Sequence, residues 1–384
     1  MKLTTTLEDV QYAASICIKC GCCAYGDWPE NHELCSIFYA DPCFSNCAGG
    51  IMATVTALAE NKLEFDQPIA DLVYTCAGCR VCDSRCSIIK YHPPQVEMID
   101  MIRLLRNEAV KRGFIPKGVT QKLADQAAAG SAAVSAELAL DDSIHKEDAE
   151  TVIFIDQNQT EAQKGILAAT ASLLKKIGSP VAVCNEIGFN EAIRYDYGLW
   201  ENLDSQMQEN WNRMNVSQAK KIVFTDPHTQ EFVAKRYPEN LAGCSSINTQ
   251  HISQVIAEAF KNGKLTSKKS DKVSVSYHDP CYLGRGLDVY DAPREALKAL
   301  PNVELVEMTR NRKSAYCCGA RVTGNYYSDH AKNVATERMK EFSETGADLL
   351  ITACSYCKQN LQKVLPADKK DMVMDITEFI DSRV

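Results

Sequence analysis

The stretch Cys76-Ala77-Gly78-Cys79-Arg80-Val81-Cys82-Asp83-Ser84-Arg85-Cys86 determines the fold of the N-terminal part of this chain. Its cysteines follow the spacing C-x2-C-x2-C-x3-C, which binds 4Fe-4S clusters in electron carriers that hold two of them. Three thiolates of such a run surround one cluster, and the fourth cysteine ligates the other cluster. The run therefore predicts an iron-sulfur module and requires a second group of cysteines.

That second group precedes the run, as Cys17-x2-Cys20-x2-Cys23. Interleaved ligation predicts one cubane cluster at Cys17, Cys20, Cys23 and Cys86, and a second cubane cluster at Cys76, Cys79, Cys82 and one further cysteine. Three residues are candidates for that last ligand: Cys35, Cys43 and Cys47. Cys43 and Cys47 are also consistent with buried small side chains, a redox pair or extra ligands. Cys22 is expected to be a spare thiol.

A third group of cysteines has a different spacing. Its members are Cys281, Cys317, Cys318, Cys354 and Cys357. The adjacent Cys317 and Cys318 do not form the C-x2-C loop that reaches two corners of a cube, and five thiolates exceed the four that a cube needs. The pattern favours a cluster of unusual shape.

Length and composition limit the class of protein. The 384 residues predict two or three domains, and the formal charge of -8 comes without a basic stripe, which argues against nucleic acid as a partner. The sequence shows neither a signal peptide nor a run of about 18 apolar residues, so we expect a cytoplasmic protein with no membrane span. In a reducing compartment, eighteen cysteines favour metal ligation over disulfides.

The cysteines and the hydrophobic pattern divide the chain into segments. Residues 1–115 hold eleven cysteines and predict a helical domain, with an amphipathic helix around Ile99, Ile102, Leu105 and Ala109 that places Arg103 and Arg106 on its polar side. Residues 116–150 hold none and are expected to be a linker containing a helix over 122–140. The remaining seven cysteines lie after the linker.

Strand and helix signals alternate from residue 151 onward. Apolar runs predict strands at 152–155, 181–183, 221–224, 273–277, 303–306 and 349–352, with helices at 161–177 and 331–345. Such alternation predicts a parallel or mixed sheet that is covered on both faces. We expect one unit used twice, over 151–270 and 271–384.

The two copies differ in their cysteines. The run Ala219–Asp226 aligns with Ala347–Cys354, which pairs Asp226 with Cys354 and Thr229 with Cys357. In the same comparison Cys184-Asn185-Glu186 stands in place of Cys317-Cys318-Gly319, and Gln157 falls near the position of Cys281. The first copy is thus expected to be a degenerate repeat. A metal-free fold and a mononuclear metal near Cys184, Asp226 and His228 are both consistent with it.

Three motifs in the second copy resemble a known family. His278-Asp279-Pro280-Cys281, Cys317-Cys318-Gly319 and Cys354-Ser355-Tyr356-Cys357 resemble the cysteine-rich CCG domain of heterodisulfide-reductase-type proteins. The whole chain resembles their C and B components fused into one, the D type, and relatives such as the iron-sulfur subunits of glycolate oxidase and anaerobic glycerol-3-phosphate dehydrogenase. The resemblance implies a non-cubane 4Fe-4S cluster on the five CCG cysteines. It also favours Cys35 over Cys43 and Cys47, because Cys35-Ser36-Ile37-Phe38 matches a C-P-x-Y segment of the family.

The expected architecture is an α+β multi-domain protein: an N-terminal α-helical ferredoxin-type domain with two clusters, followed by a pseudo-duplicated α/β CCG region. The sequence contains neither G-x-G-x-x-G nor a P-loop, so we expect no nucleotide or flavin site. The hypothesis is an electron-transfer subunit of an anaerobic oxidoreductase complex, whose partner is a flavoprotein or another iron-sulfur subunit and supplies any membrane attachment. The alternatives are a disulfide reductase and a zinc-binding interaction module. In the reductase, His278 would donate to a cluster sulfur, protonate a departing thiolate or only hold the turn before Cys281.

Overall fold

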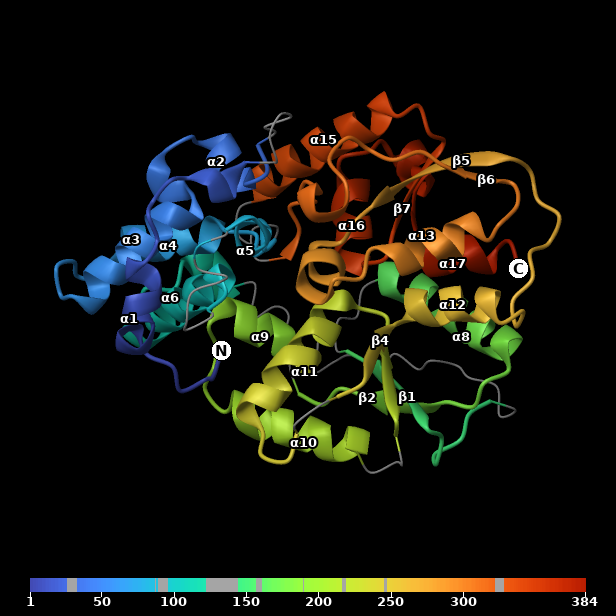
Figure 1. Ribbon diagram of the computed structural model, residues 1–384, viewed down its shortest axis with the longest axis horizontal. Coiled ribbons are helices and arrows are strands. Elements are labelled where there is room, and N and C mark those ends of the chain that lie inside the picture. The colour runs from blue at the N-terminus through green and yellow to red at the C-terminus, as the bar shows by residue number, and fades with distance from the viewer. Residues whose placement is uncertain are drawn as a thin grey trace.

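Two parallel β-sheets and an N-terminal group of helices make up the computed structural model, which describes residues 1–25, 33–86, 88, 96–121, 144–156, 161–188, 190–215, 219–244, 247–321 and 328–384. Figure 1 shows the N-terminal helices on one side of the molecule and the two α/β units stacked beside them. The expected mixture of helices and parallel strands is confirmed. The helix expected over 122–140 and the residue Gln157 lie outside the described residues.

The N-terminal helices are short because loops with cysteines interrupt them. They are α1 (Leu7–Ser15), η1 (Cys22–Ala24), α2 (Ser36–Ala40), η2 (Phe44–Asn46), α3 (Ala48–Ala59), α4 (Gln67–Thr75), α5 (Val81–Arg85) and α6 (Met98–Arg112). Thr6 and Asp9 form a capping box at the start of α1, and Asp66 caps α4. The longest of these helices, α6, ends at Gly113, whose positive φ of 76° suits a helix C-terminus.

The first α/β unit contains one four-stranded sheet. Its elements are β1 (Thr151–Ile155), α8 (Glu161–Ile177), β2 (Ala182–Asn185), α9 (Glu191–Tyr197), α10 (Leu203–Asn215), β3 (Lys221–Phe224), α11 (Pro227–Asn240), β4 (Thr249–His251) and α12 (Ile252–Lys261). All strand pairs are parallel, in the order β2-β1-β3-β4. The short strand β4 was not expected from the sequence.

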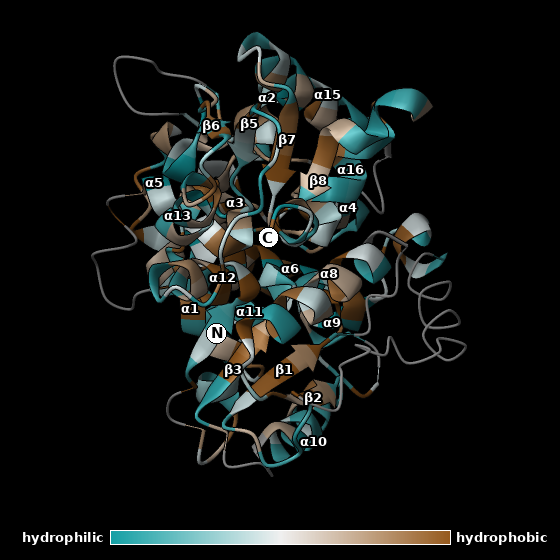
Figure 2. Ribbon diagram, turned by 90° about the vertical axis from the view of Figure 1, so that its right-hand side faces the viewer, coloured by the Kyte–Doolittle hydropathy of each residue, from teal (hydrophilic) through white to brown (hydrophobic). Residues whose placement is uncertain are grey.

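The second α/β unit has the same topology. Its elements are β5 (Val273–His278), the π-helical turn η3 (Tyr282–Gly286), α13 (Asp291–Lys298), β6 (Val303–Leu305), η4 (Arg312–Ser314), α15 (Ser328–Glu344), β7 (Leu349–Thr352), α16 (Ser355–Lys363), η5 (Ala367–Met372), β8 (Val373–Asp375) and α17 (Ile376–Asp381). The order β6-β5-β7-β8 repeats that of the first sheet, again with parallel pairs throughout. The strands are apolar in Figure 2, as expected for sheets that helices cover.

Shared hydrophobic cores join the three parts. One core combines the N-terminal helices with the first sheet, and the buried Tyr74 hydroxyl donates to the carbonyl of Tyr197 at 2.7 Å within it. A second core joins the two sheets through α8, α12 and α17. Gly198 marks the close approach of α9 to α6, because a Cβ there would lie 2.4 Å from the backbone of Arg106. The first α/β unit thus supports both neighbours.

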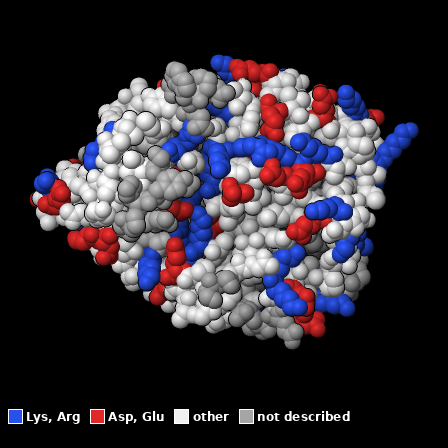
Figure 3. Space-filling model, viewed as in Figure 1, with Lys and Arg blue, Asp and Glu red and all other residues white. Residues whose placement is uncertain are grey.

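Most of the face shown in Figure 3 is uncharged. Lys and Arg side chains gather in a band across it with Asp and Glu side chains beside them, so the basic residues are less scattered on this face than the sequence indicated. Among the residues that the structure describes, no helix combines the length and apolar character that crossing a bilayer requires.

Candidate iron-sulfur sites

Backbone turns place the N-terminal cysteines in loops at helix ends. Cys76 follows the last residue of α4, and Cys86 follows the last residue of α5. Between them, Gly78 and Arg80 have positive φ values of 69° and 62°, so the chain curls through the run of cysteines. This local geometry is what a C-x2-C-x2-C loop needs to surround a cluster.

The first predicted cubane site is partly assembled in the structure. Burial raises the pKa of the Cys17 thiol, and the neighbouring Cys86 and Cys20 raise it further, which places these three together. Cys23 instead forms a hydrogen bond with Cys47, and this contact lowers the pKa of the Cys47 thiol to about 6. Cys47 is therefore a neighbour of this site.

The second predicted cubane site brings Cys35 beside the cysteine run that begins at Cys76. Burial raises the pKa of the Cys35 thiol to about 12, and Cys79 and Cys76 act in the same direction. Cys82 lies near Cys76, Cys79 and Cys35. Cys43 is exposed, and its sulfur accepts a hydrogen bond from Ser45 at 3.2 Å. Of the three candidates for the last ligand, Cys35 is the one that the structure places beside these cysteines.

The five CCG cysteines converge from three places in the second unit. Cys281 follows β5, Cys317 and Cys318 follow η4, and Cys354 and Cys357 lie at the start of α16. The Cys318 and Cys357 sulfurs lie 3.2 Å apart. Cys317 forms hydrogen bonds with Cys281 and Cys318, and Cys357 forms one with Cys354. All five thiols therefore form one connected group.

One contact joins the N-terminal domain to this group. Cys79 and Cys317 pack in one buried cluster, and the interaction of the two thiols lowers the pKa of Cys79 to about 6. Arg285 supports the contact: it donates to the carbonyl oxygens of Cys79 and Ala315, both at 2.7 Å. The guanidinium also lies near the thiols of Cys281 and Cys317. The second cubane site and the CCG group are therefore direct neighbours.

His278 lies at the end of β5, in contact with the CCG group. It is 1% exposed, and one of its ring nitrogens lies within 4.8 Å of the Cys318 and Cys357 sulfurs. Burial lowers the pKa of His278 more than its hydrogen bond with Cys318 raises it. Its Nδ1 accepts a hydrogen bond from Arg338 Nε at 3.0 Å. His278 thus lies beside the Cys318 and Cys357 sulfurs.

The degenerate repeat faces the same group through Asp226 and His228. Asp226 and Cys354 both occupy the position before the first residue of a helix, α11 and α16, but only the Asp226 side chain accepts hydrogen bonds from the helix backbone. His228 contacts Cys354, and its Nδ1 lies 3.3 Å from both carboxylate oxygens of Asp226. Burial and then Arg321 oppose protonation of His228, but Asp226 and Cys354 together outweigh them, and the pKa of His228 rises to about 10.

Cys184 is not part of that arrangement. It lies within β2, whereas Cys317 follows the equivalent strand β6 only after a loop and η4. The charged groups near the Cys184 thiol are Arg213 and Glu186. The expected equivalence of Cys184 with Cys317 is therefore wrong, because the chain continues differently after the two strands.

Buried ion pairs hold the three parts in place, and sequence reasoning missed them. Arg103, expected on the polar side of its helix, is buried and pairs with Asp196 of α9 at 2.7 Å. Asp196 also accepts from the Tyr282 hydroxyl at 2.8 Å and pairs with Arg321 at 3.1 Å. One carboxylate thus joins the N-terminal domain, the first unit and the second unit.

A second buried pair lies inside the cysteine run itself. Arg80, between Cys79 and Cys82, pairs with Glu231 of α11 at 2.7 Å, and both side chains are 1% exposed. Glu97 also pairs with Arg80. An arginine inside a C-x2-C loop was the only sequence signal for this contact, because its partner lies in a distant part of the chain.

The chain is similar to known cysteine-rich and iron-sulfur proteins. Residues 275–362 match the CCG family, a cysteine-rich domain. The D-type component of the dihydromethanophenazine:CoB–CoM heterodisulfide reductase of Methanosarcina mazei is 27% identical over 359 residues, which cover 88% of this chain and 84% of that protein. The probable iron-sulfur-binding oxidoreductase FadF of Bacillus subtilis is 27% identical over 88% of this chain and 50% of its own length.

A third relative is the EtfAB:quinone oxidoreductase of Syntrophomonas wolfei, which is 23% identical over 84% of this chain and 48% of its own length. The chain therefore spans about half of this relative and half of FadF. Among solved structures, a glutamate racemase of Bacillus anthracis aligns with 62% of this chain and 80% of its own at 12% identity, with a TM-score of only 0.31.

The matched residues 275–362 contain all five cysteines that the structure gathers beside Cys79. The similarity to the Methanosarcina mazei heterodisulfide reductase protein is much longer, since it covers 88% of the chain. The chain therefore carries a CCG cysteine-rich domain over residues 275–362, and over most of its length it is similar to iron-sulfur proteins of the heterodisulfide reductase D type.

Proposed function

We propose that this protein is an electron-transfer subunit of an oxidoreductase complex, in which the three cysteine groups form one path for electrons. The observation that carries the proposal is the packing of Cys79 against Cys317 in one buried cluster. It places a ligand of the second cubane site directly against a ligand of the CCG site. Redox centres held by these residues would exchange electrons within the chain.

The residues present fit iron-sulfur clusters. The cysteines of the three groups, all of which the structure describes, form no disulfide, and Cys317, Cys318, Cys354 and Cys357 are buried against one another. Soft thiolate ligands in such numbers suit iron-sulfur clusters better than a four-ligand zinc site. Cys17, Cys20, Cys23 and Cys86 would hold one cubane cluster, and Cys35, Cys76, Cys79 and Cys82 the other. Cys281, Cys317, Cys318, Cys354 and Cys357 would hold the non-cubane cluster. When bound, such clusters supply one-electron transfer.

The surface around the first cubane site suits a redox partner. Cys20 is exposed, and Tyr12 and Ile18 beside it are 61% and 66% exposed, which is unusual for large apolar side chains. The partner would be a flavoprotein, of the heterodisulfide reductase A type or an electron-transfer flavoprotein, or another iron-sulfur protein. The name of the relative EtfAB:quinone oxidoreductase supports a partner of the flavoprotein class.

The degenerate repeat favours a relay over a disulfide reductase. At the positions of Cys354 and Cys357 it has Asp226 and Thr229, and the Thr229 hydroxyl donates to Asp156 at 2.9 Å. Asp226 Oδ1 accepts hydrogen bonds from the backbone N–H groups of His228 and Thr229 at 2.9 and 3.1 Å. These hydrogen bonds fill the place of the missing ligands. A single CCG site is suited to passing electrons on.

Anaerobic purification followed by iron and sulfide analysis and EPR spectroscopy tests the proposal. We expect about twelve irons per chain from three four-iron sites. Capture of a flavoprotein or iron-sulfur partner, dependent on Tyr12 and Ile18, would support the relay. A colourless preparation with zinc would contradict it. Turnover of a disulfide by the chain alone with a reduced dye, abolished by Cys318→Ala, would assign the reductase activity instead.

A further inference from the structure

His278 is held between a cysteine of the CCG group and a buried arginine. A ring nitrogen lies within 4.8 Å of the Cys318 sulfur on one side. On the other side, Nδ1 lies 3.0 Å from Nε of Arg338. Both side chains are almost completely excluded from solvent, at 1% and 0% exposed. No water can therefore replace either partner without a structural change.

Arg338 determines where the proton of His278 lies. A guanidinium has only donors, so Nδ1 of His278 accepts this hydrogen bond and carries no hydrogen. A neutral imidazole has one N–H, which must then be on Nε2. Nε2 is also the ring nitrogen that remains for Cys318. His278 is therefore oriented to donate from Nε2 to the Cys318 sulfur.

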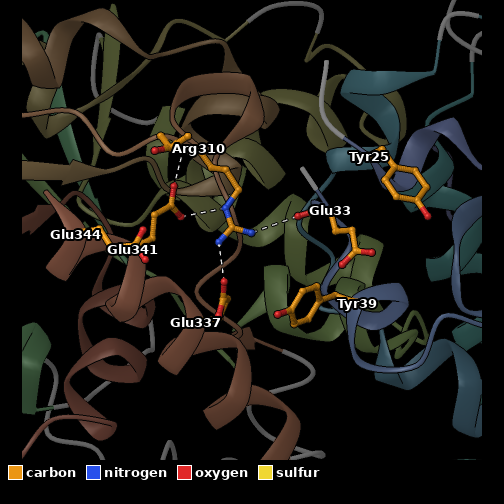
Figure 4. A pocket seen from close by; sticks show the side chains of 8 residues that line it. Tyr25, Glu33, Tyr39, Arg310, Glu337, Glu341 and Glu344 are labelled. Carbon is orange, nitrogen blue, oxygen red and sulfur yellow. Dashed lines mark hydrogen bonds and ion pairs between the residues drawn. The ribbon is translucent and has the colours of Figure 1, made fainter. Parts of the chain in front are cut away.

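The position of Arg338 is itself fixed. Its Nη1 donates to the Glu341 carboxylate at 2.7 Å and to the carbonyl of Arg310 at 2.8 Å. Glu341 also accepts from Arg310 Nε at 3.0 Å. Figure 4 shows Arg310 and Glu341 in the wall of a cavity of about 480 Å³ between the N-terminal domain and the second unit. The guanidinium is held at three points.

We propose that Arg338 is a positioning residue that holds His278 in its Nε2–H form, so that Cys318 receives one permanent hydrogen bond. The inference rests on the proposed function, because Cys318 is a ligand of the CCG cluster there. Hydrogen bonds to ligating sulfurs stabilise the more negative, reduced state and so raise the reduction potential. His278 then donates a fixed hydrogen bond to Cys318. It does not transfer its proton to a departing thiolate, which was the other role considered from the sequence.

Substitutions of the two residues separate a specific hydrogen bond from a packing role. Arg338→Met keeps the length of the side chain and removes the donor to Nδ1. His278→Leu removes the N–H and keeps a similar volume, whereas His278→Gln restores an amide N–H near the position of Nε2. His145→Leu, at an exposed position, is the matched control. The readouts are the midpoint potential of the CCG cluster by EPR-monitored titration and its coupling to an exchangeable proton by pulsed EPR in D2O.

We expect Arg338→Met and His278→Leu to move the midpoint potential to more negative values and to weaken or abolish the exchangeable-proton coupling. His278→Gln and His145→Leu should keep both close to those of the parent protein. An unchanged potential and coupling in Arg338→Met would overturn the inference, as would equal shifts in His278→Gln and His278→Leu. If Arg338→Met does not fold, the two His278 variants decide. A parent protein without a CCG cluster signal would count against the proposed function instead.

Discussion

Arg285 donates from Nε to the backbone carbonyl of Cys79 at 2.7 Å, although the two residues belong to opposite ends of the fold. Arg285 lies in the π-helical turn η3 after Cys281, and Cys79 lies in the N-terminal cysteine run. The same guanidinium reaches Ala315, two residues before Cys317. The Arg285 guanidinium thus joins the loop of Cys79 to the loop of Cys317. These loops carry residues of the proposed second cubane site and the proposed CCG site.

Replacing Arg285 should weaken this junction. Arg285→Met removes charge-assisted hydrogen bonds to Cys79 and Ala315, and we expect a loss of about 3 kcal/mol in the free energy of unfolding. Urea unfolding under anaerobic conditions measures this loss. Arg312→Ala is the control, because its 2.8 Å ion pair with Asp291 is exposed and should contribute less than about 1 kcal/mol. Equal effects of the two variants would contradict the assignment.

The Arg80–Glu231 pair predicts a larger loss. Glu231→Ala leaves the guanidinium of Arg80 buried with fewer anionic partners, so we expect a loss of about 3 to 5 kcal/mol in stability. Glu150→Ala removes one partner of the exposed pair between Glu150 and Lys220, for which about 0 to 1 kcal/mol is expected. Thermal or urea unfolding compares the two. A Glu231 variant as stable as the Glu150 variant would show that the buried pair does not hold the domains.

Asp375 predicts a pH dependence of stability. Burial raises the pKa of this carboxyl to about 7 in the folded protein, despite hydrogen bonds from Thr377. Its stabilising contribution is fully present below the unfolded value near 3.8 and is lost as the pH rises through about 7. The full loss corresponds to about 4 kcal/mol.

Asp375→Asn should therefore become more stable relative to the parent as the pH rises from about 4 to about 7, as measured by the unfolding free energy at each pH. For Asp348→Asn, the stability difference from the parent should change with pH in the opposite direction. Hydrogen bonds from Ser274 lower the pKa of the exposed Asp348, so its contribution is lost as the pH falls. A stability difference for Asp375→Asn that does not change with pH would contradict the raised pKa.

Cysteine substitutions test the ligand set of the second cubane site. Cys35→Ser should remove one cluster and lower the iron content from about twelve to about eight per chain. Cys43→Ser should leave it unchanged, because Cys43 is exposed and contacts Ser45 rather than the cysteine run. Iron analysis and EPR of the anaerobic proteins distinguish the two. Loss of a cluster in Cys43→Ser alone would reassign the ligand.

The sequence predicted the parts of the fold that depend on local pattern. The helix expected at 161–177 coincides with α8, and the expected strands at 221–224 and 349–352 coincide with β3 and β7. The strands β4 (Thr249–His251) and β8 (Val373–Asp375) were missed, because three residues of mixed polarity carry no periodic signal. Only pairing with β3 and β7 makes them strands.

The cysteine groups could also be predicted, since ligand spacing is local, but the residues around them could not. Arg103 was expected on a polar helix face, yet it is buried because Asp196 compensates its charge from a distant element. Arg338 and His278 likewise meet only through the tertiary fold. Sequence patterns report which side chains avoid water, and they do not report which buried charges find a partner.

The buried ion pairs at Asp196 should affect the rate of electron transfer between the proposed redox centres. A flexible hinge would let the separation of the redox centres fluctuate, and electron tunnelling would then wait for each closure. Here Arg103, Tyr282 and Arg321 converge on one buried carboxylate, so separating the domains would expose several unpaired charges. Transfer between the centres should therefore proceed at the same rate in buffer and in viscous glycerol solution. Only the association with a partner protein would become slower as the viscosity of the solvent increases.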